Sequence, residues 1–169
     1  TVVTGRAYPV ERGVPYALFA DAFVPFLRKL DAGRLQLLTR GGGSELEQLF
    51  PALADEGRTG RGAPAGDPTE LKARLHWTFT QLLARLAQKQ PLLVVLENLQ
   101  WADASSLELL HFAARQLRSE RLLVLCTYND ADRDADPALR TAEQSLASLG
   151  VARSMPLGAL SRTAVDELV

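Results

Sequence analysis

The chain has 169 residues, of which 47% are apolar and 23% are charged, and its formal net charge is −1. This length and composition suit one folded domain with a buried core and exclude a disordered chain. The near-neutral charge provides no basic surface for nucleic acid or an anionic membrane, so neither is expected as a partner of this region. No apolar run approaches ~18 residues, no signal-peptide pattern opens the chain, and Cys126 is its single cysteine, so a reducing cytoplasm is the expected location.

The first half of the chain predicts one strand and one long helix, followed by irregular segments. The β-branched residues of Thr1–Thr4 predict a short strand that could extend to Tyr8. Apolar residues at helical spacing predict a helix over Tyr16–Leu30, with a kink or break just before Pro25 because proline lacks an N–H donor. The segment 31–67 is interpreted as an insertion of short helical pieces and a loop rich in Gly, Pro and Ala.

The second half alternates helices with apolar strands. Asp67 and Pro68 are typical of an N-cap and a first helical residue, so a helix is expected from there to about Gln88. Further on we expect strands at Leu92–Glu97, Leu122–Thr127 and Val151–Met155, helices at Ala104–Arg118 and Pro137–Leu149, a polar loop at Asp130–Asp136, and a last helix after Ser161. Strand–helix–strand units of this size imply right-handed crossovers, and therefore an α/β fold with a parallel sheet sandwiched by helices.

The most informative stretch is Pro91–Leu110, with the sequence PLLVVLENLQWADASSLELL. Its residues Leu92–Glu97 are typical of a strand that is buried on both faces and ends in a carboxylate. A helix is expected to begin directly afterwards, at Asp103 or Ala104. Nucleotide-hydrolysing α/β proteins present a Mg²⁺ ligand beside phosphate in this way.

This stretch resembles the Walker B region of the STAND-type P-loop ATPases, which are AAA-like domains of large signal-transduction proteins such as the LuxR-type transcriptional regulators. Gly5–Phe19 resembles the family segment that follows the P-loop helix, and Leu122–Asp130 resembles its sensor strand. The resemblance implies that residues 1–169 are a partial P-loop ATPase domain from the second strand onward. It also implies ATP and Mg²⁺ as cofactors, and other domains of the same polypeptide as partners.

The phosphate-binding loop itself is missing from the sequence. A P-loop needs a glycine-rich turn that ends in Gly-Lys-Ser/Thr, so that backbone N–H groups and one lysine can hold the phosphates. Gly41–Ser44 and Gly57–Gly62 contain no Gly-Lys and are interpreted as loops. In the family the P-loop lies shortly before the segment that Gly5 opens, so we expect it upstream of Thr1.

The absence of the P-loop strand has a consequence for the sheet. In the family that strand lies between the sensor strand, here Leu122–Thr127, and the last strand, here Val151–Met155. Without it, the facing edges of these two strands lack backbone partners, and each buried unpaired group costs about 1–3 kcal/mol. We therefore expect either that the isolated chain is unstable or that the two strands pair directly.

The resemblance also assigns candidate roles to single residues. Glu97 matches the first Walker B acid, which is associated with Mg²⁺; the alternative is a strand-end acid that caps a neighbouring helix. Asn98 stands where relatives carry a second acid that activates water, and an amide cannot accept that proton; the alternative is a turn residue. Thr127 and Asn129 are candidates for nucleotide contact, although relatives usually place a charged Arg near Asn129. These departures are expected to weaken hydrolysis more than binding.

The remaining polar residues carry weaker predictions. Trp101 is expected to pack beneath the loop, and Asp103 to cap the following helix. His76 and His111 have no partners at ligand spacing, so no metal site is expected there. Three arginines could contact nucleotide or a neighbouring domain, with solvated side chains as the alternative: Arg58, Arg61 and Arg74.

Two classes of function remain open. The first is an ATP-dependent regulatory switch that hydrolyses slowly, in which case the fragment itself is expected to be inactive as an ATPase. The second is a non-catalytic scaffold that keeps the P-loop fold for contacts between domains. An unrelated α/β enzyme with an unknown substrate is a weaker third alternative.

Overall fold

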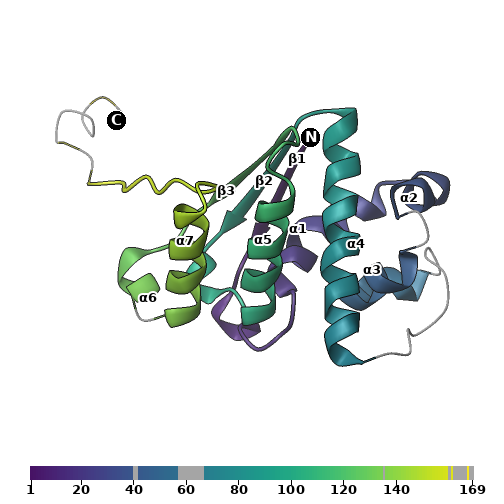
Figure 1. The fold of residues 1–169 in the computed structure, drawn as a ribbon, viewed down its shortest axis with the longest axis horizontal. Coiled ribbons are helices and arrows are strands. Elements are labelled where there is room, and N and C mark those ends of the chain that lie inside the picture. The colour runs from purple at the N-terminus through teal and green to yellow at the C-terminus, as the bar shows by residue number, and fades with distance from the viewer. Residues whose placement is uncertain (40–41, 57–66, 135, 160, 162–166, 168–169) are drawn as a thin grey trace.

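Residues 1–39, 42–56, 67–134, 136–159, 161 and 167 are described by the computed structural model of the chain. Helices lie between the strands and after the last of them (Figure 1). The elements in chain order are β1 Val2–Arg6, η1 Pro9–Glu11, α1 Ala17–Arg28, α2 Ala32–Thr39, α3 Gly43–Leu49, η2 Pro51–Glu56, α4 Pro68–Lys89, β2 Leu92–Glu97, η3 Leu99–Trp101, α5 Ala104–Gln116, β3 Leu122–Cys126, α6 Asp130–Asp134 and α7 Pro137–Ser148.

The strands form one parallel sheet in the order β1-β2-β3. Arg6 at the end of β1 lies beside Glu97 at the end of β2, and Cys126 ends β3 at nearly the same level. All three strands therefore finish at one edge, the carboxyl edge, which is where open α/β sheets bind their ligands. The predicted α/β class, with a parallel sheet flanked by helices, is confirmed.

The two faces of the sheet differ in their covering. Val3, Val94 and Leu96 are buried on the face that carries the helices, where α1 packs along β1. Figure 1 shows α5 and α7 in front of the strands. On the opposite face Val2 is 64% exposed and Leu123 is 65% exposed. This second face is therefore open to solvent in the described part of the chain.

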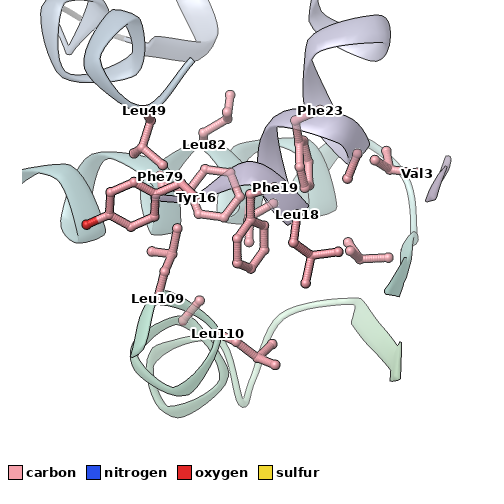
Figure 2. Packing of buried hydrophobic residues seen from close by; sticks show 14 of the residues in the cluster. Val3, Tyr16, Leu18, Phe19, Phe23, Leu49, Phe79, Leu82, Leu109 and Leu110 are labelled. Carbon is pink, nitrogen blue, oxygen red and sulfur yellow. The ribbon is translucent and has the colours of Figure 1, made fainter. Parts of the chain in front are cut away.

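The core lies between the covered face of the sheet and the helices. Phe79 of α4 packs its ring against Phe19 and Phe23 of α1, with centroid distances of 5.1 Å in both pairs. Figure 2 shows Leu49 on one side of these rings and Leu110 on the other. Because aromatic pairs in this geometry add to the gain from burying their area, the three rings fix α1 and α4 relative to each other.

The predicted insertion contributes to this core. Its helices α2 and α3 pack against α4 and bury Leu35, Leu38, Leu46 and Leu49. Residues 57–66 of the predicted loop lie outside the described residues. Helix α4 begins at Pro68 as predicted, but Asp67 before it makes no capping hydrogen bond with its side chain.

The break predicted near Val24, just before Pro25, is wrong, because α1 continues through both residues. The alternative of a kink at this point stays a prediction. Proline inside a helix costs about 3 kcal/mol or more. The helix bears this cost because its residues on both sides of Pro25 are buried: Phe23 and Leu27 are both 0% exposed. Burial of two large side chains offsets roughly 1.5–3 kcal/mol each.

The predicted strand at Val151–Met155 does not form either. Gly150 takes the left-handed conformation at φ 67° and donates its N–H to the carbonyl oxygen of Ala147 at 2.9 Å, which ends α7. The chain then runs without regular structure, and Leu157 is 95% exposed. A strand needs backbone partners along its length, and β3 does not pair with this segment. Direct pairing of the two strands is therefore not the outcome, and within the described residues β3 is an edge strand.

The end of the chain gives two further results. The segment predicted as a polar loop at Asp130–Asp136 contains the short helix α6. Asn129 begins this helix, because its Oδ1 accepts the N–H of Ala131 at 3.0 Å. A capping side chain favours a helical turn at this place in a polar segment. The helix predicted after Ser161 lies outside the described residues.

Candidate functional site

Glu97 forms an ion pair between two strand ends at the carboxyl edge of the sheet, with Arg6 of β1 as its partner. Its Oε2 accepts a hydrogen bond from Nε of Arg6 at 2.7 Å, and Nη2 of Arg6 lies 2.5 Å from the same oxygen. Oε1 makes no hydrogen bond within the described residues, and the Glu97 side chain is 31% exposed. Glu97 therefore does not cap a helix; it lies at the sheet edge with one oxygen available.

Arg6 is a site residue that the sequence reasoning missed. The parallel pairing of β1 with β2 places it beside Glu97, and its backbone N–H is held by Oδ2 of Asp21 at 2.8 Å. The hydrogen bond to Glu97 and the negative charge of that carboxylate raise the pKa of Arg6 above its usual value. The signal was present in the sequence, since both residues close strands of the same predicted sheet.

Asn98 lies just past the end of β2 in the left-handed conformation, at φ 61° and ψ 46°. Asparagine is one of the few residues that adopt this conformation readily. Its backbone N–H donates to Oγ1 of Thr127 at 3.3 Å, whereas its side-chain amide makes no hydrogen bond within the described chain. The interpretation as a turn residue is supported by this geometry, and the amide is still available to a ligand.

Thr127 and Asn129 follow β3 and are tied to the loop after β2. The carbonyl oxygen of Thr127 accepts the N–H of Leu99 at 2.9 Å. The backbone N–H of Asn129 donates to Oε1 of Gln100 at 3.3 Å. The structure thus brings Asn98, Thr127 and Asn129 together beside Glu97 on two adjoining loops. Gln100 was not among the predicted site residues.

Asp103 and Trp101 take the structural roles that were predicted. Oδ1 of Asp103 accepts the N–H of Ser106 at 2.9 Å, which caps α5. The same atom accepts the N–H of Tyr16 at 3.0 Å and so fixes the start of α1 as well. Trp101 is partly buried and packs against the core. These two residues hold the loop that follows Glu97 in place.

The geometry allows a Mg²⁺ ion only with help from other ligands. Among the described residues there is no group of three or more His, Cys, Asp or Glu side chains that could hold a metal. Glu97 could supply one oxygen, and Mg²⁺ typically keeps several waters and takes its other ligands from phosphate. The residues therefore fit Mg²⁺ bound together with a phosphate, and they do not form a metal cage of their own.

The two histidines serve other purposes. Nε2 of His76 lies 3.3 Å from the hydroxyl oxygen of Tyr16 in the core, and burial lowers the pKa of His76. His111 contacts Oγ of Ser145 at 2.8 Å and so links α5 to α7. Each ring therefore has a polar partner that explains its position without a metal.

The remaining candidates also have structural partners. Burial raises the pKa of Cys126 to about 12, so its thiol stays protonated and unreactive. Arg74 forms an ion pair with Glu45 and thereby joins α4 to α3. Arg58 and Arg61 lie outside the described residues. Among the described helices, none is long and apolar enough to span a membrane.

Comparison with known protein families matches residues 1–125 to the AAA ATPase domain. The matched region runs from β1 to the last residue but one of β3; it includes Glu97 and Asn98 and ends before Thr127 and Asn129. Neither the curated proteins nor the solved structures contain a significant match. Since the match covers most of the 169 residues and the fold agrees with it, the chain belongs to the AAA ATPase domain family.

Proposed function

We propose that this AAA ATPase domain is the ATP- and Mg²⁺-binding part of a regulatory switch in a STAND-type protein, such as a LuxR-type transcriptional regulator. In such a switch the bound nucleotide, more than its hydrolysis, sets the output of the other domains. The observation that carries the proposal is the position of Glu97, at the carboxyl edge with one carboxylate oxygen available. A cytoplasmic location is part of the same proposal.

The phosphates would be held by a P-loop on a further strand beside β3, which the resemblance expects upstream of Thr1. Two features support a neighbour at this position. In the sheet formed by the described residues β3 is an edge strand, and Leu123 and Leu125 on its open face are 65% and 41% exposed. A strand and its following helix would pair with the edge and cover these side chains, at a gain of about 1.5–3 kcal/mol for each large apolar residue buried.

Within the proposed site the residues of this chain have separate tasks. Glu97 orients the metal through one oxygen or a bound water. Thr127 and Asn129 offer a hydroxyl and an amide to the terminal phosphate. Asn98 can orient a water molecule by hydrogen bonding, but its amide has no basic site that could accept the proton. Slow hydrolysis follows from this last property.

A non-catalytic scaffold is the second candidate. It is favoured by the Arg6–Glu97 ion pair, since a guanidinium already neutralises the carboxylate that the metal would need. Both side chains are partly exposed, however, and exposed ion pairs are worth only about 0–1 kcal/mol. Such a pair can therefore open when a metal–nucleotide complex binds, and the switch is the better proposal.

The first test is nucleotide binding by the polypeptide that carries both this domain and its phosphate-binding segment. Glu97→Ala should weaken Mg²⁺-dependent ATP binding by at least about tenfold, since even groups that only support metal ligands contribute about 10–100-fold. A fluorescent ATP analogue titrated with and without Mg²⁺ measures the effect. Glu120→Ala is the control, because Glu120 precedes β3 at the opposite edge of the sheet. Undetectable ATP binding by the parent protein would overturn the switch and leave the scaffold as the better proposal.

The second test concerns turnover. Asn98→Asp places a carboxylate in the position where relatives carry the second acid, and general bases typically contribute about 10²–10⁴-fold. We expect the ATPase rate to rise by at least about tenfold in single-turnover measurements, with little change in ATP affinity. Because aspartate also tolerates the left-handed conformation, the fold should be unaffected. An unchanged rate would show that position 98 does not face the attacking water.

A further inference from the structure

Gln100 is a buried polar residue in the loop between β2 and α5. Its side chain is 4% exposed, and its Oε1 accepts the backbone N–H of Asn129 at 3.3 Å. Transfer of an amide into the interior costs roughly 1–3 kcal/mol unless it is hydrogen-bonded. An apolar side chain could fill this space without that cost, so the hydrogen bond to Asn129 explains why glutamine is present.

This hydrogen bond differs from the others between the two loops, of which only the one from the Asn98 N–H to Oγ1 of Thr127 also uses a side chain. The hydrogen bonds from Leu99 N–H to Thr127 O and from Thr127 N–H to Leu96 O, both 2.9 Å, join backbone groups and continue the β2–β3 pairing. They would form with many sequences. The contact of Gln100 uses a side chain and reaches beyond the end of the ladder to Asn129. It therefore depends on the residue at position 100 alone.

Asn129 is held from its other side by α6. Its Oδ1 accepts the N–H of Ala131 at 3.0 Å, and its carbonyl oxygen accepts the N–H of Arg133 at 2.9 Å. Oδ1 is thus committed to the helix, so the side-chain NH₂ group is the part of Asn129 left to donate to a ligand. The direction of that donor depends on the backbone of Asn129, which Gln100 fixes.

On the basis of the proposed nucleotide-binding function, we propose that Gln100 is a positioning residue that sets the preference for ATP over ADP. It holds the backbone of Asn129 so that the side-chain NH₂ group faces the terminal phosphate. It also joins the loop that follows Glu97 to the loop that follows β3, so both loops move as one unit when that phosphate is bound or lost. Gln100 itself does not touch the nucleotide.

The first measurement needs no nucleotide. Hydrogen exchange at the Asn129 amide is compared in the parent protein and in Gln100→Leu, which fills the same space without an acceptor. A hydrogen bond contributes about 1 kcal/mol net, so its loss in Gln100→Leu should make exchange at the Asn129 amide roughly fivefold faster. Gln100→His should restore protection, because a ring nitrogen can accept the hydrogen bond. Thr80→Val is the matched control: Thr80 is 1% exposed and bonds only within α4, to the carbonyl of His76.

The second measurement is the ratio of the ADP and ATP dissociation constants. In Gln100→Leu the ratio should fall by about fivefold or more, with ADP affinity unchanged, while Gln100→His and Thr80→Val keep the parent ratio. Unchanged exchange at Asn129, or an unchanged ratio in a protein that binds ATP, would overturn the role of Gln100 alone. If the parent protein bound neither nucleotide, the proposed function would fail, and the phosphate role of Gln100 with it.

Discussion

Replacing Gly5 with alanine is expected to lower the free energy of unfolding by about 3 kcal/mol or more, which is a large part of the ~5–15 kcal/mol typical of a domain. A Cβ at this position would lie 2.6 Å from Cβ of Ala22 and 2.8 Å from the carbonyl oxygen of Leu18. Neither atom can rotate away, because one is fixed to the backbone of α1 and the other is part of it. The whole helix would have to move off β1.

The measurement is urea unfolding followed by circular dichroism. Gly5→Val, with two further methyl groups in the same space, should leave little folded protein. Gly13→Ala is the matched control, since a Cβ at Gly13 meets nothing within 4 Å, and its effect should stay within about 0.5 kcal/mol. Equal midpoints for Gly5→Ala and Gly13→Ala would mean that α1 does not approach β1 this closely.

Gly5 also shows what a sequence can and cannot predict here. Leu92–Glu97 was predicted with its observed bounds, because an apolar run this short, bounded by Pro91 and Asn98, suits a buried strand better than a helix. The need for glycine at position 5 depends on α1, a helix that begins twelve residues later and crosses the strand at this point. Contacts of this kind follow from tertiary structure, which local patterns do not contain.

The errors have the same origin. A break near Val24 was predicted, with a kink as the alternative, from a local rule about proline. The helix does not break there, because the burial of Phe23 and Leu27 on both sides of Pro25 outweighs that rule. The strand at Val151–Met155 was predicted from its own residues, although a strand forms only when a partner pairs with it. In both cases the local sequence preference was interpreted correctly. Packing in the core decided the outcome for the helix, and the lack of a pairing partner decided it for the strand.

The candidate site was predictable to a similar extent. Glu97 and Asn98 were located from the strand that precedes them, and the structure adds the left-handed backbone of Asn98. The roles of both residues toward nucleotide stay predictions. The sequence analysis missed Arg6 and Gln100 because each is important for a hydrogen bond to a residue far away in the sequence. Arg6 bonds to Glu97, and Gln100 bonds to Asn129. Pairing the ends of the predicted strands would have revealed the first, but no pattern indicates the second.

The second large effect is expected at Asp103, which connects the site loop to two helices. Asp103 is 5% exposed, and its carboxylate accepts three hydrogen bonds: from the N–H of Tyr16 at 3.0 Å, the N–H of Ser106 at 2.9 Å and the hydroxyl of Ser106 at 2.6 Å. Tyr16 adopts the left-handed conformation at φ 61°, which is unfavourable for a tyrosine. The hydrogen bond from Tyr16 to Asp103 therefore helps to hold a strained backbone at the start of α1.

Asp103→Leu should cost about 3–5 kcal/mol in urea unfolding, since loss of the cap costs about 0.5–2 kcal/mol and each buried donor left unpaired costs about 1–3 kcal/mol. Asp103→Asn retains one acceptor oxygen and should cost clearly less. Asp31→Leu is the control: Asp31 caps α2 through the N–H of Arg34 at 2.8 Å but is exposed, so water can replace it. Because Asp103 fixes both α1 and α5, its loss should also weaken nucleotide binding under conditions where the protein is still folded. Equal costs at Asp103 and Asp31 would show that α5 is capped without any coupling to α1.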